Sequence, residues 1–198
     1  MPKEYDRAYF ERWYHRPDTR VNSHLEVRRK VALAVAMAEY VMRRPLRSVL
    51  DVGCGEGAWL PHLRALRSRI EYTGLDPSDY AVERFGRTRN IHKAAFHELP
   101  SLDLGVHDLV ICSDVLHYVA ERDIRPGIAA IAKACDGLAF LEVLTKEDDI
   151  VGDLDGLMRR PAAFYRNTFR KAGFTQIGPY CWLPRELRST VAELEIVS

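Results

Sequence analysis

The chain has 198 residues, 47% of them hydrophobic, which suits one domain with a sizeable core. Lysine and arginine total 29 against 28 acidic residues, so the formal net charge of +1 gives no reason to expect a nucleic-acid partner. No stretch reaches the roughly 18 apolar residues of a membrane span, and the first residues lack an apolar secretory core. We therefore expect a cytoplasmic protein without a membrane partner, a monomer or a homodimer.

The four cysteines, Cys54, Cys112, Cys135 and Cys181, form no CxxC pair and accompany no clustered histidines. A structural zinc site needs such spacing, so no metal is expected. Cys112 and Cys135 lie in apolar runs and are expected to be buried thiols, which suits a reducing compartment.

Aromatic residues dominate positions 4–15, and a helix with apolar residues at helical spacing follows over 24–43. Beyond it, short apolar runs alternate with helical stretches. The predicted strands span 48–52, 70–75, 91–96, 108–113, 138–144, 175–182 and 191–197. The predicted helices span 57–68, 79–87, 122–134 and 162–172. This alternation favours a parallel sheet covered by helices on both faces.

Only the eight residues 183–190 separate the last two predicted strands, too few for a crossover helix. These strands should therefore pair as an antiparallel hairpin. We predict an α/β, Rossmann-like, doubly wound sheet of seven mostly parallel strands that ends in this C-terminal hairpin. Residues 1–198 would form one domain, with 46–198 as its core and 1–45 as a helical lid or cap.

The strongest chemical signal is the run LDVGCGEG at 50–57, where an apolar strand enters three glycines and then a predicted helix. Glycines permit a tight turn and let a ligand approach where a side chain would collide. A helix start beyond them presents unpaired N–H groups to a polar ligand. Asp51 adds an acid beside the turn. A carboxylate there would repel a pyrophosphate, but it suits a ligand that carries an ammonium and a sulfonium.

A second acid, Asp76, ends the next predicted strand, in the segment GLDPS at 74–78. From that place a carboxylate can accept hydrogen bonds from both hydroxyls of a ribose, because it offers two acceptor oxygens. An acid beside a glycine turn and a second acid at the end of the next strand together indicate a site for an adenosine-containing cation.

At this point the sequence resembles the class I S-adenosylmethionine-dependent methyltransferases. The resemblance rests on LDVGCGEG and GLDPS, on HELP at 97–100 and on HDLVICSDVLHYV at 107–119, and it spans Leu46 to Gly173. It implies S-adenosylmethionine as cofactor and S-adenosylhomocysteine as product. The expected reaction is methyl transfer to an oxygen or nitrogen of a small-molecule acceptor.

The resemblance also implies where the cofactor lies. The glycine turn would face its methionine part, Asp76 its ribose, Pro77 and the segment 96–99 its adenine, and Ser113 its sulfonium. The expected cofactor-binding residues are Asp51, Gly53, Cys54, Gly55, Asp76, Pro77, Phe96, His97, Glu98 and Ser113. The family often has an aspartate where Ala95 stands, so His97, Glu98 or backbone carbonyls would have to serve the adenine amino group.

His117 is the expected catalytic residue, because the resemblance places it at the edge of the acceptor pocket and an imidazole titrates near neutrality. It would act as a general base on a hydroxyl acceptor, or else only position the substrate. The aromatic stretch from Tyr5 to His15 would close over the site as a lid, or else dock as a helix that fills a core groove.

Basic residues offer a further hypothesis about the acceptor. The run Arg28-Arg29-Lys30, and Arg159 and Arg160 in the long connection 145–166, could bind an acidic substrate, or else be solvated. Two other functions also stay open. One is a non-catalytic S-adenosylmethionine-binding module, and the other is an NAD-dependent oxidoreductase that uses the looser pattern Gly53-x-Gly55-x-x-Ala58.

Overall fold

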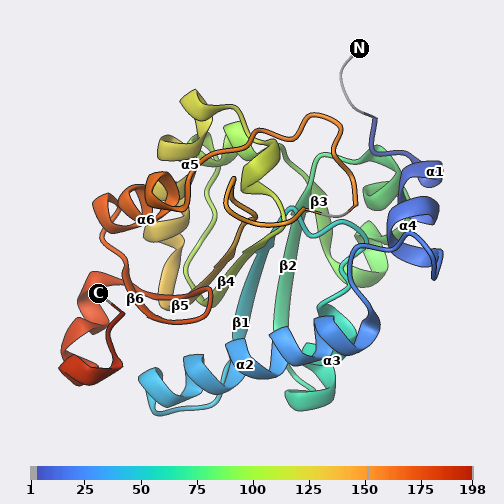
Figure 1. Cartoon of the computed structure of the whole chain (residues 1–198). Coiled ribbons are helices and arrows are strands. Elements are labelled where there is room, and N and C mark those ends of the chain that lie inside the picture. Colours follow the sequence, from blue (N-terminus) through green and yellow to red (C-terminus); the bar gives the residue numbers. More distant parts are fainter. Residues whose placement is uncertain (1–3, 151, 198) are drawn as a thin grey trace.

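A computed structural model describes residues 4–150 and 152–197. In this part of the chain a seven-stranded sheet has the order β3-β2-β1-β4-β5-β7-β6 (Figure 1). The strands are β1 (Ser48–Val52), β2 (Glu71–Asp76), β3 (Ile91–Lys93), β4 (His107–Ser113), β5 (Cys135–Glu142), β6 (Thr175–Gly178) and β7 (Cys181–Leu183). The first five strands are parallel, and β7 is antiparallel to both of its neighbours. The predicted fold class is thus confirmed.

Helices cover both faces of the sheet. They are α1 (Arg7–Phe10), α2 (His24–Met42), α3 (Leu60–Leu66), α4 (Asp79–Arg89), α5 (Glu121–Ala134) and α6 (Ala162–Lys171), with a π-helical turn over Glu11–His15 and 3-10 segments over Phe96–Ser101, Leu116–Tyr118, Arg185–Thr190 and Glu193–Glu195. Apolar residues of α2 and α3 form one core with the sheet, and those of α5 and α6 form a second. No helix in the described residues is long and apolar enough to cross a membrane.

The helix α2 shows how local sequence sets these boundaries. Ser23 and Glu26 cap its start reciprocally: Ser23 Oγ accepts from the Glu26 N–H at 3.2 Å, and Glu26 Oε2 accepts from the Ser23 N–H at 2.6 Å. The helix ends at Arg43, whose φ of 54° is left-handed, two residues before Pro45. Its buried face, which includes Val31 and Val35, lies against the sheet. The segment 4–15 lies beside α4 (Figure 1).

The C-terminal hairpin exists, but its predicted position was wrong. The single strand predicted over 175–182 is itself the hairpin, because the chain turns between β6 and β7 through Pro179 and Tyr180, with Tyr180 at a φ of 57°. The strand predicted over 191–197 is absent. That stretch holds a 3-10 segment over Glu193–Glu195, and Val197 donates one backbone hydrogen bond to Gln176 at 2.9 Å.

Candidate active site

The glycine turn that follows β1 has the geometry of a ligand cradle. Gly53 and Gly55 have φ values of 72° and 54°, in the left-handed region that glycine adopts without strain. The N–H groups of Gly53 and Cys54 donate to the Leu75 carbonyl at 2.7 and 3.1 Å, which ties the turn to β2. A Cβ built on Gly53 would lie 2.3 Å from Val115 Cγ2, so no side chain fits there.

Asp51 lies in the core of the sheet, only 2% exposed. Its Oδ2 accepts a hydrogen bond from the Tyr72 hydroxyl at 2.8 Å. Burial raises the pKa of Asp51 from its ordinary 3.8 to about 7; the Tyr72 hydrogen bond lowers this pKa and the charge of Asp76 raises it. Near neutrality this carboxyl group is therefore partly ionised, and a bound cation would favour its ionised form.

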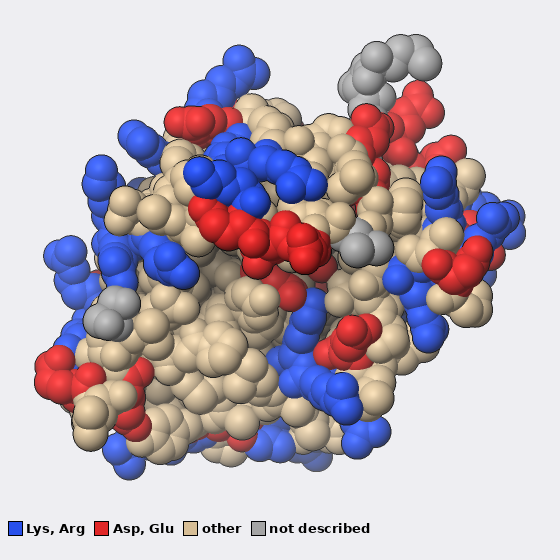
Figure 2. Space-filling view, viewed as in Figure 1, with Lys and Arg blue, Asp and Glu red and all other residues tan. Residues whose placement is uncertain are grey.

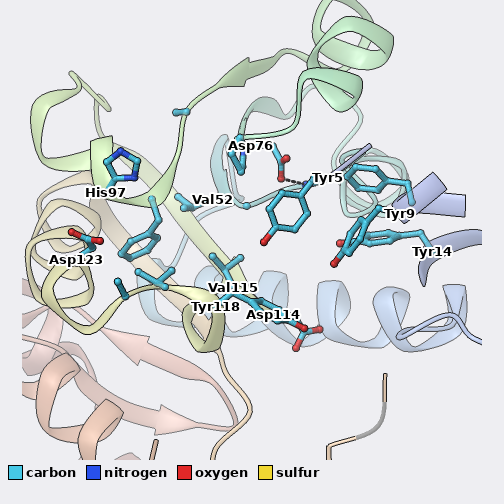
Figure 3. Close-up of a pocket in the computed structure, with 18 residues that line it drawn as sticks. Tyr5, Tyr9, Tyr14, Val52, Asp76, His97, Asp114, Val115, Tyr118 and Asp123 are labelled. Carbon is cyan, nitrogen blue, oxygen red and sulfur yellow. Dashed lines mark hydrogen bonds between the residues drawn. The ribbon is translucent and has the colours of Figure 1, made fainter. Parts of the chain in front are cut away.

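Asp76 ends β2 and faces the cavity above the turn (Figure 3). Its Oδ2 accepts from the Gly55 N–H at 2.7 Å, and its Oδ1 from the Ser78 N–H at 2.9 Å. Burial raises its pKa, and these two hydrogen bonds oppose the rise. Each carboxylate oxygen has two lone pairs, so both can still accept a hydroxyl hydrogen.

A first cavity of about 240 Å³ opens over these residues. Six of the ten expected cofactor-binding residues line it: Gly53, Gly55, Asp76, Pro77, Phe96 and His97. Phe96 packs on Gly127, where a Cβ would lie 2.1 Å from the ring. His97 and Asp123 lie together at the end of the cavity away from Tyr5 (Figure 3).

Glu98, which was expected to contact the adenine, does not line the cavity. The Glu98 carboxylate caps its own 3-10 segment by accepting from the Ala95 N–H at 2.7 Å. Asp123, which belongs to none of the sequence motifs, supplies a carboxylate at this end of the cavity from α5. Its only sequence signal was its position in the first turn of a helix.

A second cavity of about 130 Å³ adjoins the first. Its lining includes the other expected methionine-side residues, Asp51, Cys54 and Ser113, together with His117. Five residues line both cavities and mark their junction: Tyr9, Tyr14, Gly53, Asp114 and Tyr118. The two cavities therefore form neighbouring compartments at the carboxyl ends of β1, β2 and β4.

His117 is buried, and its ring lies edge-on to Tyr118 with centroids 4.3 Å apart. The Leu144 N–H donates to His117 Nδ1 at 3.4 Å. A neutral imidazole that accepts at Nδ1 carries its hydrogen on Nε2, so this contact favours the tautomer of His117 that donates from Nε2.

The N-terminal aromatic segment lines both cavities. Tyr5, Tyr9, Phe10 and Tyr14 border the first, and Trp13 joins Tyr9 and Tyr14 on the second. Three contacts fix the segment to the cradle: Ser78 Oγ donates to the Tyr5 carbonyl at 2.5 Å, the rings of Phe10 and Tyr80 lie 5.5 Å apart, and His15 Nε2 lies 3.0 Å from Glu56 Oε2.

A polar network joins α2 to the ends of β4 and β5. Lys30 Nζ contacts Glu142 Oε1 at 2.7 Å and donates to Asn22 Oδ1 at 2.9 Å. Asn22 in turn donates to Asp114 Oδ2 at 2.9 Å, and Ser113 Oγ donates to Glu142 Oε2 at 2.5 Å. The network fixes Asp114 at the junction of the two cavities.

The basic residues that suggested an acidic substrate lie elsewhere. Arg160 is buried and donates to the carbonyls of Leu116 and Val119, at 3.4 and 2.8 Å, and to the Tyr165 hydroxyl at 3.2 Å. Lys30 is held by Glu142. Neither lines either cavity.

Comparisons with known proteins agree with this fold. Residues 50–137 match a family model described as a methyltransferase domain. No curated protein matches the sequence.

Solved structures match over most of the chain. A SAM-dependent methyltransferase from Archaeoglobus fulgidus is 17% identical, with a TM-score of 0.63 over 84% of this chain and 73% of that one. The sugar N-methyltransferase KedS8 from Streptoalloteichus sp ATCC 53650 is 17% identical, with a TM-score of 0.64 over 79% of this chain and 87% of that one. Magnesium protoporphyrin IX methyltransferase from Synechocystis PCC 6803, with bound SAH, is 20% identical, with a TM-score of 0.61 over 90% of this chain and 92% of that one.

The sheet with its reversed strand and the acid-flanked glycine turn define the class I methyltransferase fold. The methyltransferase-domain model matches residues 50–137 of this chain, and the fold is shared with the solved methyltransferases named above.

Proposed function

We propose that this protein transfers a methyl group from S-adenosylmethionine to an oxygen or nitrogen of a small molecule. The observation that carries the proposal is the junction of the two cavities. Asp76 lines one compartment, where it would accept from a ribose, the buried Asp51 lines the adjoining one, and Gly53 of the glycine turn lines both. S-adenosylmethionine supplies a methyl group on a positively charged sulfur, which is a good leaving group.

The residues of this chain would bind and orient the reactants. Asp51 would bind the ammonium of the methionine part, and Asp76 the two ribose hydroxyls. Pro77, Phe96 and His97 would border the adenine. Asp123 would accept a hydrogen bond from the adenine amino group, a role that the family often gives to an aspartate at the position where this chain has Ala95. The same walls argue against a dinucleotide, because a pyrophosphate would meet Asp51 and Asp76 with no lysine or arginine among the described lining residues.

The acceptor would enter the second cavity, between His117 and the aromatic segment. Tyr9, Trp13 and Tyr14 would keep water from the reacting atoms and fix the acceptor next to the methyl group, so that much of the acceleration comes from proximity. His117 would position the acceptor through Nε2.

The proposal is tested by methyl transfer itself. Purified protein with S-adenosylmethionine is incubated with panels of small amines, phenols and carboxylates, and S-adenosylhomocysteine formation is measured. Turnover of at least one acceptor is expected, and it should be lost in Asp76→Asn at cofactor concentrations that saturate the wild type. Failure of S-adenosylhomocysteine to bind, measured by calorimetry, would overturn the proposal.

A further inference from the structure

The walls of the two cavities carry negative charge. Asp51, Asp114 and Asp153 line the second cavity, and Asp76, Asp114 and Asp123 line the first. No lysine or arginine is among the described residues that line either one. A carboxylate or phosphate acceptor would lose its hydration here without gaining a lysine or arginine partner from the walls, which is unfavourable.

Three of these acids already have a proposed role toward the cofactor, namely Asp51, Asp76 and Asp123. Asp114 and Asp153 remain. Asp114 lies at the junction, where an acceptor must approach the methyl group, and Asp153 is 7% exposed on the wall of the second cavity alone. The acceptor compartment therefore contains two carboxylates, those of Asp114 and Asp153, that have no proposed role in binding the cofactor.

Asp114 is held in place at some conformational cost. Its φ is 59°, in the left-handed region that non-glycine residues seldom occupy. Its N–H donates to the Glu142 carbonyl at 3.1 Å, and its carboxylate accepts from Asn22. Lys30, the cation of this network, contacts Glu142 and Asn22 and makes no direct ion pair with Asp114.

Aromatic rings complete the wall around these carboxylates. Tyr9, Trp13, Tyr14 and Tyr118 line the second cavity. The Tyr118 hydroxyl donates to the Asp153 carbonyl at 2.7 Å, and burial, with the charge of Asp153, raises the pKa of Tyr118. Tyr118 therefore stays a neutral phenol. Aromatic faces beside carboxylates are the usual surroundings of a bound ammonium group.

Residues 147–155, in the connection between β5 and α6, carry the same sign of charge, with Lys146, Arg159 and Arg160 on either side of them. Five of these residues are acidic: Glu147, Asp148, Asp149, Asp153 and Asp155. Ile150 and Asp153 of this connection line the second cavity. Acidic side chains gather at the centre of the face in Figure 2, where the connection passes in Figure 1. Such a field attracts cations and repels anions.

We infer that the acceptor is a small amine that enters the second cavity as an ammonium ion, bound by Asp114 and Asp153 and enclosed by the aromatic rings. This inference rests on the proposed function and names its substrate class. The ammonium first gives one proton to the Asp114 carboxylate. The nitrogen lone pair then forms the N–C bond to the methyl group while the C–S bond breaks, and its electron pair stays on sulfur, which becomes a neutral thioether. The product leaves as a methylated ammonium, and Asp114 returns its proton to water.

Three probes of similar shape and different charge test the inference on the wild-type protein. They are 2-phenylethylamine, phenylacetate and 2-phenylethanol, each titrated by calorimetry at pH 7.5 into protein saturated with S-adenosylhomocysteine. The amine is expected to bind at least about tenfold more tightly than either of the others. The inference is overturned if phenylacetate or 2-phenylethanol binds as tightly as the amine, or if the amine does not bind to the loaded protein. Failure of S-adenosylhomocysteine itself to bind would instead overturn the proposed function.

Matched variants then locate the charge. Asp114→Asn and Asp153→Asn should each weaken 2-phenylethylamine binding about tenfold or more, while S-adenosylhomocysteine affinity changes less than about threefold. Asp149→Asn removes the same charge from an exposed position of the same connection and should change neither affinity. If Asp114→Asn weakens the binding of S-adenosylhomocysteine and spares that of the amine, Asp114 serves the cofactor and the inference is wrong.

Discussion

The Tyr72 hydroxyl donates a hydrogen bond to Asp51 Oδ2 at 2.8 Å across the β1–β2 pair. Both groups are buried, and burial raises the pKa of each. Tyr72 therefore remains a neutral donor, whereas Asp51, with a pKa of about 7, changes its charge near neutrality. This pair makes the cradle sensitive to pH before any ligand is bound.

Cofactor affinity is expected to depend on the ionisation of Asp51. An ammonium group binds the carboxylate and not the neutral acid, so the affinity for S-adenosylhomocysteine should rise as pH increases from about 5.5 to about 7 and then level off. Below pH 7 the change should approach tenfold per pH unit. Calorimetry between pH 5.5 and 8.5 measures it, and a flat profile would contradict the assignment of Asp51.

Two variants separate Asp51 from other titrating groups. Asp51→Asn should bind the ligand more weakly and lose most of the pH dependence. Tyr72→Phe removes the hydrogen bond that lowers the pKa of Asp51, so its affinity curve should shift to higher pH. A Tyr72→Phe curve that shifts to lower pH would show that the hydrogen bond does not favour the ionised carboxylate.

The same raised pKa predicts the pH dependence of stability. Between about pH 4 and pH 7 the folded protein keeps a proton on Asp51 that the unfolded chain has released, so the free energy of unfolding should fall as pH rises through this window. Asp51→Asn should abolish this part of the fall and be at least as stable as wild type at pH 7.5. Urea titrations of the ligand-free protein at pH 5 and pH 7.5 measure both quantities.

Much of this site was predictable because its signals are local. The glycines at 53 and 55 and the acids Asp51 and Asp76 follow short apolar runs, and parallel strands bring their carboxyl ends to one edge. The sequence also indicates that the last strands pair as a hairpin. It misplaces that hairpin because Gly178 and Pro179, a common turn pair, stand inside an otherwise strand-like run.

The acceptor compartment could not be predicted in the same way. Asp114 and Asp153 lie 39 positions apart in the sequence, on segments that no periodicity connects, and their charge matters only because the basic residues nearby are bound elsewhere. Arg160 had suggested an anion site by its charge alone. Its burial against the carbonyls of Leu116 and Val119 could be known only from the folded chain.

Lys30 is expected to stabilise the fold through Glu142. Burial raises the pKa of Glu142, the charge of Asp114 adds to the rise, and Lys30 opposes it. Lys30→Met leaves the buried carboxyl without its cation and should lower the free energy of unfolding by about 2–3 kcal/mol at pH 8. The loss should be smaller at lower pH, because protonation of Glu142 removes the charge that has lost its partner. The double variant Lys30→Met/Glu142→Gln should recover most of the stability, and a double variant as unstable as the single one would show that Lys30 acts by packing alone.

The role of His117 can be separated into positioning and proton transfer by two substitutions. Because the Leu144 N–H donates to Nδ1, we expect Nε2 to donate a hydrogen bond that positions the acceptor. Glutamine can donate from its amide but cannot take a proton, whereas alanine can do neither. His117→Gln should therefore keep kcat within about tenfold of wild type, and His117→Ala should raise KM and lower kcat further.

If His117 were a general base, both variants would lose about 10²–10⁴-fold in kcat. The wild-type rate would then also follow an apparent pKa near roughly 6.5 that both variants lack. Steady-state kinetics of the three proteins with one accepted substrate, from pH 5.5 to 9, distinguish these outcomes.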